Sequence, residues 1–193
     1  MKRYIKSAIL PVSGEDLDVR MDIALDPNTP IDMLETLAKD KSSDIRLCVI
    51  VNPNTPKELV NKLLFEDSNN RFLEKVALCM DTPTYVLTLL AQSNDDSIKC
   101  AVAKNPHTSK EVLVELSKEE NPAIRWTIAN NKSTPKDVLS ELSRDWNDTV
   151  RSEVAENLNT PRYILETLIN DENEVVRSMA KRTYNWRLRN DRV

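Results

Sequence analysis

The feature that most constrains this chain is an internal repeat of about 26 residues that runs through most of its length. A threonine, usually followed by proline, recurs with steps of 26, 27, 26, 26 and 26 residues, at Thr29, Thr55, Thr82, Thr108, Thr134 and Thr160. Ten residues before each Thr stands an aliphatic or Phe residue, at Val19, Ile45, Phe72, Ile98, Ile124 and Val150, with Val176 as a seventh copy. The one extra residue falls within residues 65–71. Two landmarks that keep phase over a chain are typical of a solenoid.

Each repeat is predicted to contain two short helices, of which the first begins at the Thr-Pro pair. Thr is expected to be the N-cap and Pro the first helical residue, where its missing N–H costs nothing. An acid three residues after the Thr completes a capping box in four of six copies. Apolar residues then follow at i, i+1 and i+4, as in Val138, Leu139 and Leu142, which predicts one buried stripe.

The second helix is predicted to have an N-cap three residues before each aliphatic landmark. These positions hold Asp16, Ser42, Asn69, Asp95, Asn121, Asn147 and Asn173. The buried stripe runs at i, i+4 and i+5, as in Ile124, Ile128 and Ala129. The helix is expected to end at an Asn with a left-handed C-cap, at Asn52, Asn105, Asn131 and Asn157. Because it has only about two turns, 3₁₀ geometry is an alternative for some copies.

The repeat unit resembles the leucine-rich repeat variant family and, more loosely, HEAT-type repeats. The segment LAKDKSSDIRLCVIVNPNTPKELV, residues 37–60, is the closest match to that pattern, and the resemblance covers roughly residues 16–180. It implies alternating α and 3₁₀ helices in a right-handed superhelix. One member type also has an N-terminal cysteine cluster that binds an iron–sulfur centre. Cys48, Cys79 and Cys100 form no such cluster, so no cofactor is expected here. The family defines a shape and leaves the activity open.

The predicted fold is therefore an all-α, right-handed superhelical solenoid of two-helix repeats. Residues 16–180 are expected to form the repeat array as a single domain. Residues 1–15 are a degenerate N-terminal capping segment. Residues 181–193 are a basic C-terminal capping tail, expected to continue as a terminal helix that carries Tyr184 and Trp186.

Composition excludes several classes of function. The chain has a single glycine, Gly14, which argues against glycine-rich phosphate loops. Three irregularly spaced cysteines favour reduced thiols rather than a disulfide framework. The N-terminal apolar run is short and is broken by Pro11, and no stretch is long enough to span a membrane. We therefore expect a cytoplasmic protein without a membrane partner.

The first candidate binding surface is a ladder of basic residues that directly follow the landmarks. We call the basic ladder Arg20, Arg46, Lys99, Arg125, Arg151 and Arg177. Stacked repeats would align these cations into a stripe that could follow a phosphate backbone. An acidic ladder lies six residues before the next basic position, at Asp40, Glu66, Glu119, Asp145 and Asp171. The alternative is therefore that the two ladders pair or cap carbonyls and so join the repeats.

The second candidate consists of positions two, three and six residues after each landmark, which vary freely between copies. They include Met21, Leu47, Val51, Leu78, Lys104, Trp126, Asn130 and Glu153. The early copies are apolar and the later ones polar, with Trp126 near the middle. Such a surface would suit a peptide or a protein partner. The alternative is that some of these residues belong to the core between repeats.

The third candidate is the tail, residues 181–193, which has a net charge of +4 against −8 for the rest of the chain. Its aromatic residues Tyr184 and Trp186 could stack on nucleic-acid bases. The alternative is an amphipathic capping helix with a solvated face.

Catalysis has little support in the sequence. The only histidine, His107, lies in a loop, and neither a nucleophile–base arrangement nor a cluster of metal ligands can be assembled around it. We therefore predict a non-catalytic scaffold that binds a protein or peptide, without a cofactor or a small-molecule substrate. The alternative is a nucleic-acid-binding solenoid that uses the basic ladder.

Overall fold

The computed structural model describes residues 16–66 and 69–190, and within them the chain is entirely helical. These residues form thirteen α-helices and no strand, which confirms the predicted all-α repeat solenoid. The predicted capping segment, residues 1–15, lies outside the described residues. No helix in the described ranges is both long and apolar enough to cross a membrane.

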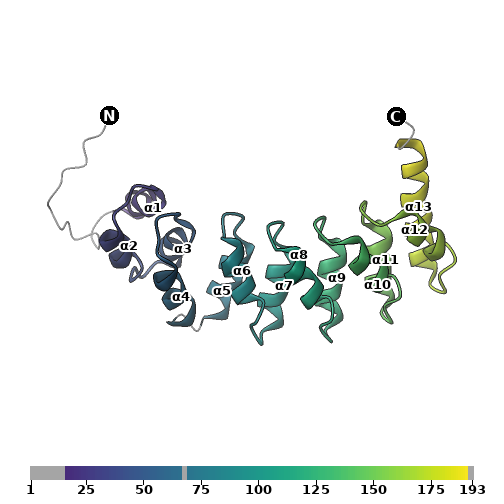
Figure 1. The fold of residues 1–193 in the computed structure, drawn as a ribbon, viewed down its shortest axis with the longest axis horizontal. Coiled ribbons are helices and arrows are strands. Elements are labelled where there is room, and N and C mark those ends of the chain that lie inside the picture. Colours follow the sequence, from purple (N-terminus) through teal and green to yellow (C-terminus); the bar gives the residue numbers. More distant parts are fainter. Residues whose placement is uncertain (1–15, 67–68, 191–193) are drawn as a thin grey trace. The chain divides into compact units, whose positions relative to one another are not determined.

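The helices alternate along the chain as the repeat predicts, and Figure 1 shows this order. The helices that follow the Thr landmarks are α2 (Ile31–Leu37), α4 (Lys57–Glu66), α6 (Thr84–Leu90), α8 (Lys110–Leu116), α10 (Lys136–Leu142) and α12 (Arg162–Leu168). The second helices are α1 (Leu17–Leu25), α3 (Ser43–Val51), α5 (Asn70–Leu78), α7 (Asp96–Lys104), α9 (Pro122–Asn130), α11 (Asp148–Glu156) and α13 (Glu174–Asn190). All are α-helical, so the 3₁₀ alternative does not occur in the residues described.

The helices group into two compact units, one ending at Phe72 and the other beginning at Leu73. The division follows directly after the stretch that contains the extra residue. In the first unit α1 packs on α3, and α2 and α4 adjoin α3. In the second unit α7 packs on α9, α9 on α11 and α11 on α13. The predicted boundaries at residues 15 and 180 stay predictions.

The core consists of the aliphatic stripes that the repeat pattern predicts. In α10 the side chains of Val138, Leu139 and Leu142 are buried, and the equivalent residues of α6, α8 and α12 are buried as well. The second helices contribute residues such as Ile128 and Ala129 of α9, which are fully buried. Neither helix of a repeat could bury its stripe alone, so the stacking of neighbours supplies the core.

The Thr of the Thr-Pro pair has a different role from the predicted one. Pro30, Pro83, Pro135 and Pro161 are themselves the N-caps, and no side chain caps these four helices. The Thr hydroxyl instead donates to the carbonyl six residues earlier, at the end of the preceding helix. For Thr160 the bond to the Val154 carbonyl is 2.6 Å, and the same bond recurs at Thr29, Thr55, Thr82, Thr108 and Thr134. The predicted Thr N-cap is therefore wrong, and the Thr links the two helices of a repeat.

The predicted N-caps of the second helices are largely confirmed. The side chains of Ser42, Asn69, Asp95, Asn121, Asn147 and Asn173 each accept a hydrogen bond from the amide two residues further on. Asp16 occupies the N-cap of α1 without such a bond.

The Asn residues that end the second helices are not left-handed C-caps, so that prediction is wrong. Asn52, Asn105, Asn131 and Asn157 have extended backbone and are buried. Each side-chain amide donates to carbonyls of the preceding repeat. Asn131 Nδ2 lies 2.7 Å from the Ala103 oxygen and 3.2 Å from the Asn105 oxygen. The Asn131 Oδ1 atom accepts from the Ser133 amide at 2.7 Å. These residues form a ladder, the asparagine ladder, that joins neighbouring repeats.

The last helix, α13, departs from the repeat because it does not stop where the others do. At its Asn position stands Thr183, which is buried within the continuous helix. One turn later the Arg187 guanidinium donates to the Thr160 carbonyl at 2.5 Å. The predicted terminal helix with Tyr184 and Trp186 is therefore present, and it covers α11 and α12.

Candidate functional site

The basic ladder is engaged in ion pairs between repeats. Arg125 forms a two-pronged pair with Asp145, with Nε–Oδ2 and Nη2–Oδ1 distances of 2.6 and 2.9 Å. Arg151 binds Asp171 in the same way, at 2.8 and 2.9 Å. Both arginines are buried, with 6% and 7% of their surface exposed. Two-pronged pairs of this kind are rigid and directional.

The remaining members of the ladder form ion pairs or bind backbone carbonyls. Arg20 pairs with Asp40 at 2.8 Å, and Lys99 pairs with Glu119 at 2.7 Å. Arg46 and Arg177 each donate to two backbone carbonyls in the loop that precedes their helix. The Arg46 guanidinium also lies 4.9 Å from the centroid of the Phe72 ring.

The Arg–Asp pairs shift the pKa values of their members in the direction that favours the charged forms. The hydrogen bonds to Asp145 and Asp171 raise the pKa values of Arg125 and Arg151 above their ordinary value, although burial opposes the rise. The bond from Arg151 lowers the pKa of Asp171, against the effect of its own burial. Arg20, Lys99, Arg125 and Arg151 are thus paired with carboxylates of the fold, while Arg46 and Arg177 bind loop carbonyls, which favours the alternative that the ladders pair or cap carbonyls.

The variable positions of the second helices form a groove in the second unit. It has a volume of about 710 Å³ and lies over α5, α7 and α9. One repeat position contributes Glu74, Cys100 and Trp126, one from each helix, and we call these three residues the central row. Leu78 lines the groove from α5, one turn after Glu74. Trp126 and Leu78 are exposed over 41% and 44% of their surface, a large apolar exposure for side chains in a cleft.

The centre of the groove is partly dehydrated and has negative charge around it. Burial raises the pKa of the Cys100 thiol, and a hydrogen bond with Thr127 opposes that rise. The negative charges of Asp96 and Glu74 raise the pKa further. Asp96 is held in place by the Asn121 side chain, whose amide donates to Oδ2 at 2.7 Å.

Trp126 is connected to the next repeat at the edge of the groove. Asn130 of the same helix donates a short hydrogen bond to Glu153 of α11. Burial raises the pKa of Glu153, and bonds from Asn130 and Trp126 oppose the rise while the charge of Glu156 adds to it. The Asn130–Glu153 bond therefore joins α9 to α11 at this edge of the groove, and 41% of the Trp126 surface stays exposed.

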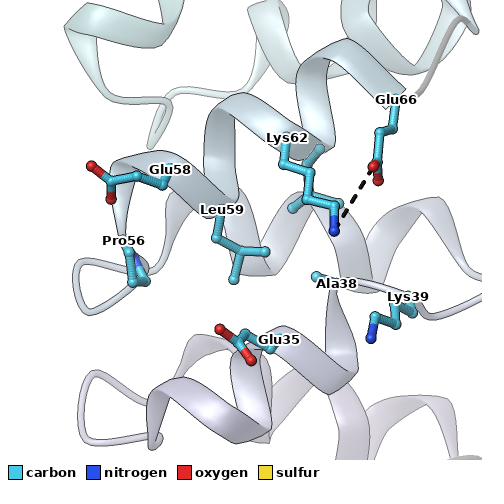
Figure 2. Close-up of a pocket in the computed structure, with 9 residues that line it drawn as sticks. Glu35, Ala38, Lys39, Pro56, Glu58, Leu59, Lys62 and Glu66 are labelled. Carbon is cyan, nitrogen blue, oxygen red and sulfur yellow. Dashed lines mark ion pairs between the residues drawn. The ribbon is translucent and has the colours of Figure 1, made fainter.

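Two other hollows lie between consecutive first helices. One, of about 330 Å³ in the first unit, lies between α2 and α4; Figure 2 shows Glu35 facing Leu59 across it, with Lys62 3.8 Å from Glu66. The other, of about 440 Å³ in the second unit, lies between α6 and α8, and it is lined at the same repeat positions. Because the hollow recurs at equivalent positions, we attribute it to the spacing of the repeats rather than to a specific ligand.

Of the other predicted surface residues, Leu78, Lys104 and Asn130 line the groove with Trp126, whereas Leu47 and Trp186 do not line it. Leu47 is half-buried on α3 in the first unit. Trp186 lies on α13 with 49% of its surface exposed and does not line the groove. In the tail, Arg182 pairs with Glu156, and Arg162 donates to the Tyr184 hydroxyl at 2.8 Å. The tail thus makes the contacts of a capping helix.

No chemistry-bearing cluster stands out elsewhere in the described part of the chain. His107 lies in an exposed loop, where its backbone amide donates to Asn105. Residues 16–66 and 69–190 contain no group of three or more His, Cys, Asp or Glu residues placed to hold a metal ion.

Sequence reasoning named Leu78, Lys104, Trp126 and Asn130 of the groove and missed its other lining residues, among them Glu74, Cys100 and Asp96. Glu74 and Cys100 occupy the same repeat position as Trp126, two residues after the landmark, so their alignment was the signal that could have identified them. Asp96 follows a predicted N-cap, and nothing in the sequence distinguishes it from an ordinary helix-start acid.

Comparison with known proteins identifies the fold. No family model and no curated protein matches this chain. A solved leucine-rich repeat variant with a novel repetitive structural motif is 22% identical, covering 89% of this chain and 68% of that protein, with a TM-score of 0.59. An engineered protein of solved structure is 17% identical over 87% of this chain and 88% of its own, with a TM-score of 0.38. The resemblance that the repeat motif predicts is thus matched in three dimensions, and the chain has the fold of a leucine-rich repeat variant.

Proposed function

We propose that this protein is a non-catalytic binding scaffold that recognises a protein or peptide in the groove over α5, α7 and α9. The observation that carries the proposal is the exposed Trp126 in a groove that is built from freely varying positions and that the exposed Leu78 also lines. Positions that build the repeat are occupied by the same residue types in most copies, whereas these positions are not. A reducing compartment such as the cytoplasm is part of the proposal, because the cysteine pattern favours reduced thiols.

The energetics of interfaces support Trp126 as the anchor. Tryptophans in partly enclosed pockets are enriched among the residues that dominate binding, because a partner removes a large apolar area from water.

Nucleic-acid binding through the basic ladder has weaker support. Arg125 and Arg151 already have their fork of donors on Asp145 and Asp171. A phosphate would have to replace a buried, two-pronged carboxylate, and that exchange would disrupt the contact between repeats. The basic ladder is therefore better suited to joining repeats than to tracking a phosphate backbone.

A peptide-display selection tests the proposal directly. The full chain is used to enrich peptides from a random library, and the affinities of the enriched peptides are measured for wild type, Trp126→Ala and Trp146→Ala. Trp146 is the matched control, because it is a loop tryptophan with 74% exposure that does not line the groove. We expect Trp126→Ala to weaken binding at least about tenfold, the range of an interface hot spot, and Trp146→Ala to leave it unchanged.

Equal affinity of the enriched peptides for wild type and Trp126→Ala would overturn the proposal. A parallel titration with labelled RNA and DNA at two salt concentrations covers the alternative. Binding that falls steeply with salt and is lost in Arg125→Ala/Arg151→Ala variants that remain folded would make the basic ladder the functional surface.

A further inference from the structure

The charges around the groove indicate which kind of segment it accepts. Glu74 and Asp96 line it, and both act on the thiol at its centre. The one basic residue that lines the groove, Lys104, is the last residue of α7, while Asp96 is the first. These two residues are about 12 Å apart along the helix axis at 1.5 Å per residue. The groove is therefore polarised, with its acids near the starts and centres of the helices.

The apolar part of the groove is adjacent to this acidic part. Trp126 shares the central row with Glu74, and Leu78 lies one turn further along α5 from Glu74. A partner that only filled the apolar part would leave the two carboxylates partly dehydrated and without a counter-charge, which costs free energy. An acidic partner would add like-charge repulsion to that cost.

We propose that the groove binds a peptide segment in which a Lys or Arg neighbours an apolar side chain, with the cation facing Glu74 and Asp96 and the apolar group on Trp126. This inference rests on the proposed function and specifies the chemistry of its partner. The cation gains charge-assisted hydrogen bonds to the carboxylates, and its aliphatic stem covers part of the indole face.

The test uses three pools of short fluorescein-labelled peptides of equal length with a central Leu or Phe. The flanking positions are Lys/Arg mixtures in one pool, Asp/Glu in the second and Ser/Gln in the third. Binding to the full chain is measured by fluorescence polarisation at low and high salt. We expect the Lys/Arg pool to bind about tenfold more tightly than the Ser/Gln pool at low salt, and the advantage to shrink at high salt.

Substitutions then test whether Glu74 and Asp96 are the source of the preference for the Lys/Arg pool. Glu74→Gln/Asp96→Asn is expected to abolish the advantage of the Lys/Arg pool. Asp148→Asn is the matched control, because Asp148 has in α11 the place that Asp96 has in α7. It accepts from Asn173 at 2.5 Å as Asp96 accepts from Asn121, and it does not line the groove. Asp148→Asn should leave the advantage intact, and circular dichroism confirms that each variant is folded.

The outcomes separate this inference from the proposed function. If the pools bind with equal affinity but Trp126→Ala abolishes binding, the proposed function stands and the charge preference is wrong. A Lys/Arg advantage that survives Glu74→Gln/Asp96→Asn also overturns the inference. If no pool binds the wild type, or if Trp126→Ala leaves all binding intact, both proposals fail.

Discussion

At the scale of single residues, buried polar side chains determine how neighbouring repeats register. An unpaired buried carbonyl is costly, and the ends of the short second helices leave several carbonyls without intrahelical partners. The asparagine ladder and the Thr hydroxyls bond these carbonyls in each repeat. The same residue types therefore recur because the same carbonyls recur.

Replacing one rung of the asparagine ladder tests this account. Asn131→Ala removes donors to the Ala103 and Asn105 carbonyls and the acceptor of the Ser133 amide. We expect the free energy of unfolding to fall by about 2–3 kcal/mol, the cost of leaving buried groups unsatisfied. Urea unfolding followed by circular dichroism measures the change. Asn185→Ala, on the exposed side of α13, is the control and should change the free energy of unfolding by less than about 0.5 kcal/mol. A similar loss of stability in both variants would contradict the account.

The sequence predicts which residues lie at helix ends more reliably than it predicts the hydrogen bonds that these residues make. Spacing correctly places Thr134 at a helix start and Asn131 at a helix end. It cannot show that a hydroxyl has a better acceptor six residues back, because that depends on how the chain turns. For Asn52 and Asn105, the following Pro was a usable signal, since a residue before Pro favours the extended backbone that these residues have.

At the scale of helices, the Arg–Asp pairs join a second helix to the loop that precedes the next second helix. The sequence predicts two ladders in phase, and their pairing is observed at Arg125–Asp145 and Arg151–Asp171. Composition and spacing could not decide between pairing and a free cationic stripe, because that choice depends on burial. The groove over α5, α7 and α9 was likewise predictable in its positions and not in its charge pattern.

Neutralising one carboxylate of these pairs should produce a pH-dependent loss of stability. The Arg151 bond lowers the pKa of Asp171, so its contribution is fully present above the ordinary Asp value of about 4 and is lost as pH falls through the lower folded value. Asp171→Asn is expected to cost about 2–3 kcal/mol at neutral pH, because Arg151 is left buried beside a neutral group. Unfolding curves at several pH values measure the difference, which should narrow in acid. A constant difference would show that charge is not the cause.

The carboxylate of Glu153 should destabilise the fold at neutral pH, whereas that of Asp171 stabilises it. Burial raises its pKa, so the ionised form opposes folding above the raised folded value, and this opposition vanishes below the ordinary Glu value of about 4.3. Glu153→Gln is therefore expected to raise the thermal midpoint at neutral pH, while its amide oxygen can still accept from Asn130. The gain should shrink as the pH is lowered. A destabilised variant at neutral pH would mean that the hydrogen bonds to the carboxylate outweigh its desolvation.

At the scale of the whole chain, the last helix closes the stack of the second unit. Repeat arrays need a terminal element that covers the apolar face of the final repeat. The helix α13 supplies it through Thr183, and through Arg187 on the Thr160 carbonyl. The sequence predicts this helix from the loss of the Asn stop, although the Arg187 contact could not be read from a pattern that occurs once.

Truncation tests the capping role. A chain that ends at Ala180 loses Thr183, Tyr184 and Arg187, and we expect a lower thermal midpoint with increased light scattering from exposed apolar surface. Trp186→Ala in the full-length chain is the comparison, because Trp186 is half-exposed and its removal leaves the Arg187 contact in place. If the truncated chain had the same thermal midpoint as the wild type, the tail would not contribute to stability.

The joint between α9 and α11 makes the chain extensible, because it contains all four groups that join repeats. These groups are the Ala129 carbonyl, the Asn157 amide that binds it, and Arg125 with its carboxylate partner Asp145. An additional copy of residues 121–146, inserted after residue 146, would meet the same four groups at both of its junctions. The second unit could therefore be lengthened by whole repeats, and the surface positions of each inserted repeat could be varied independently.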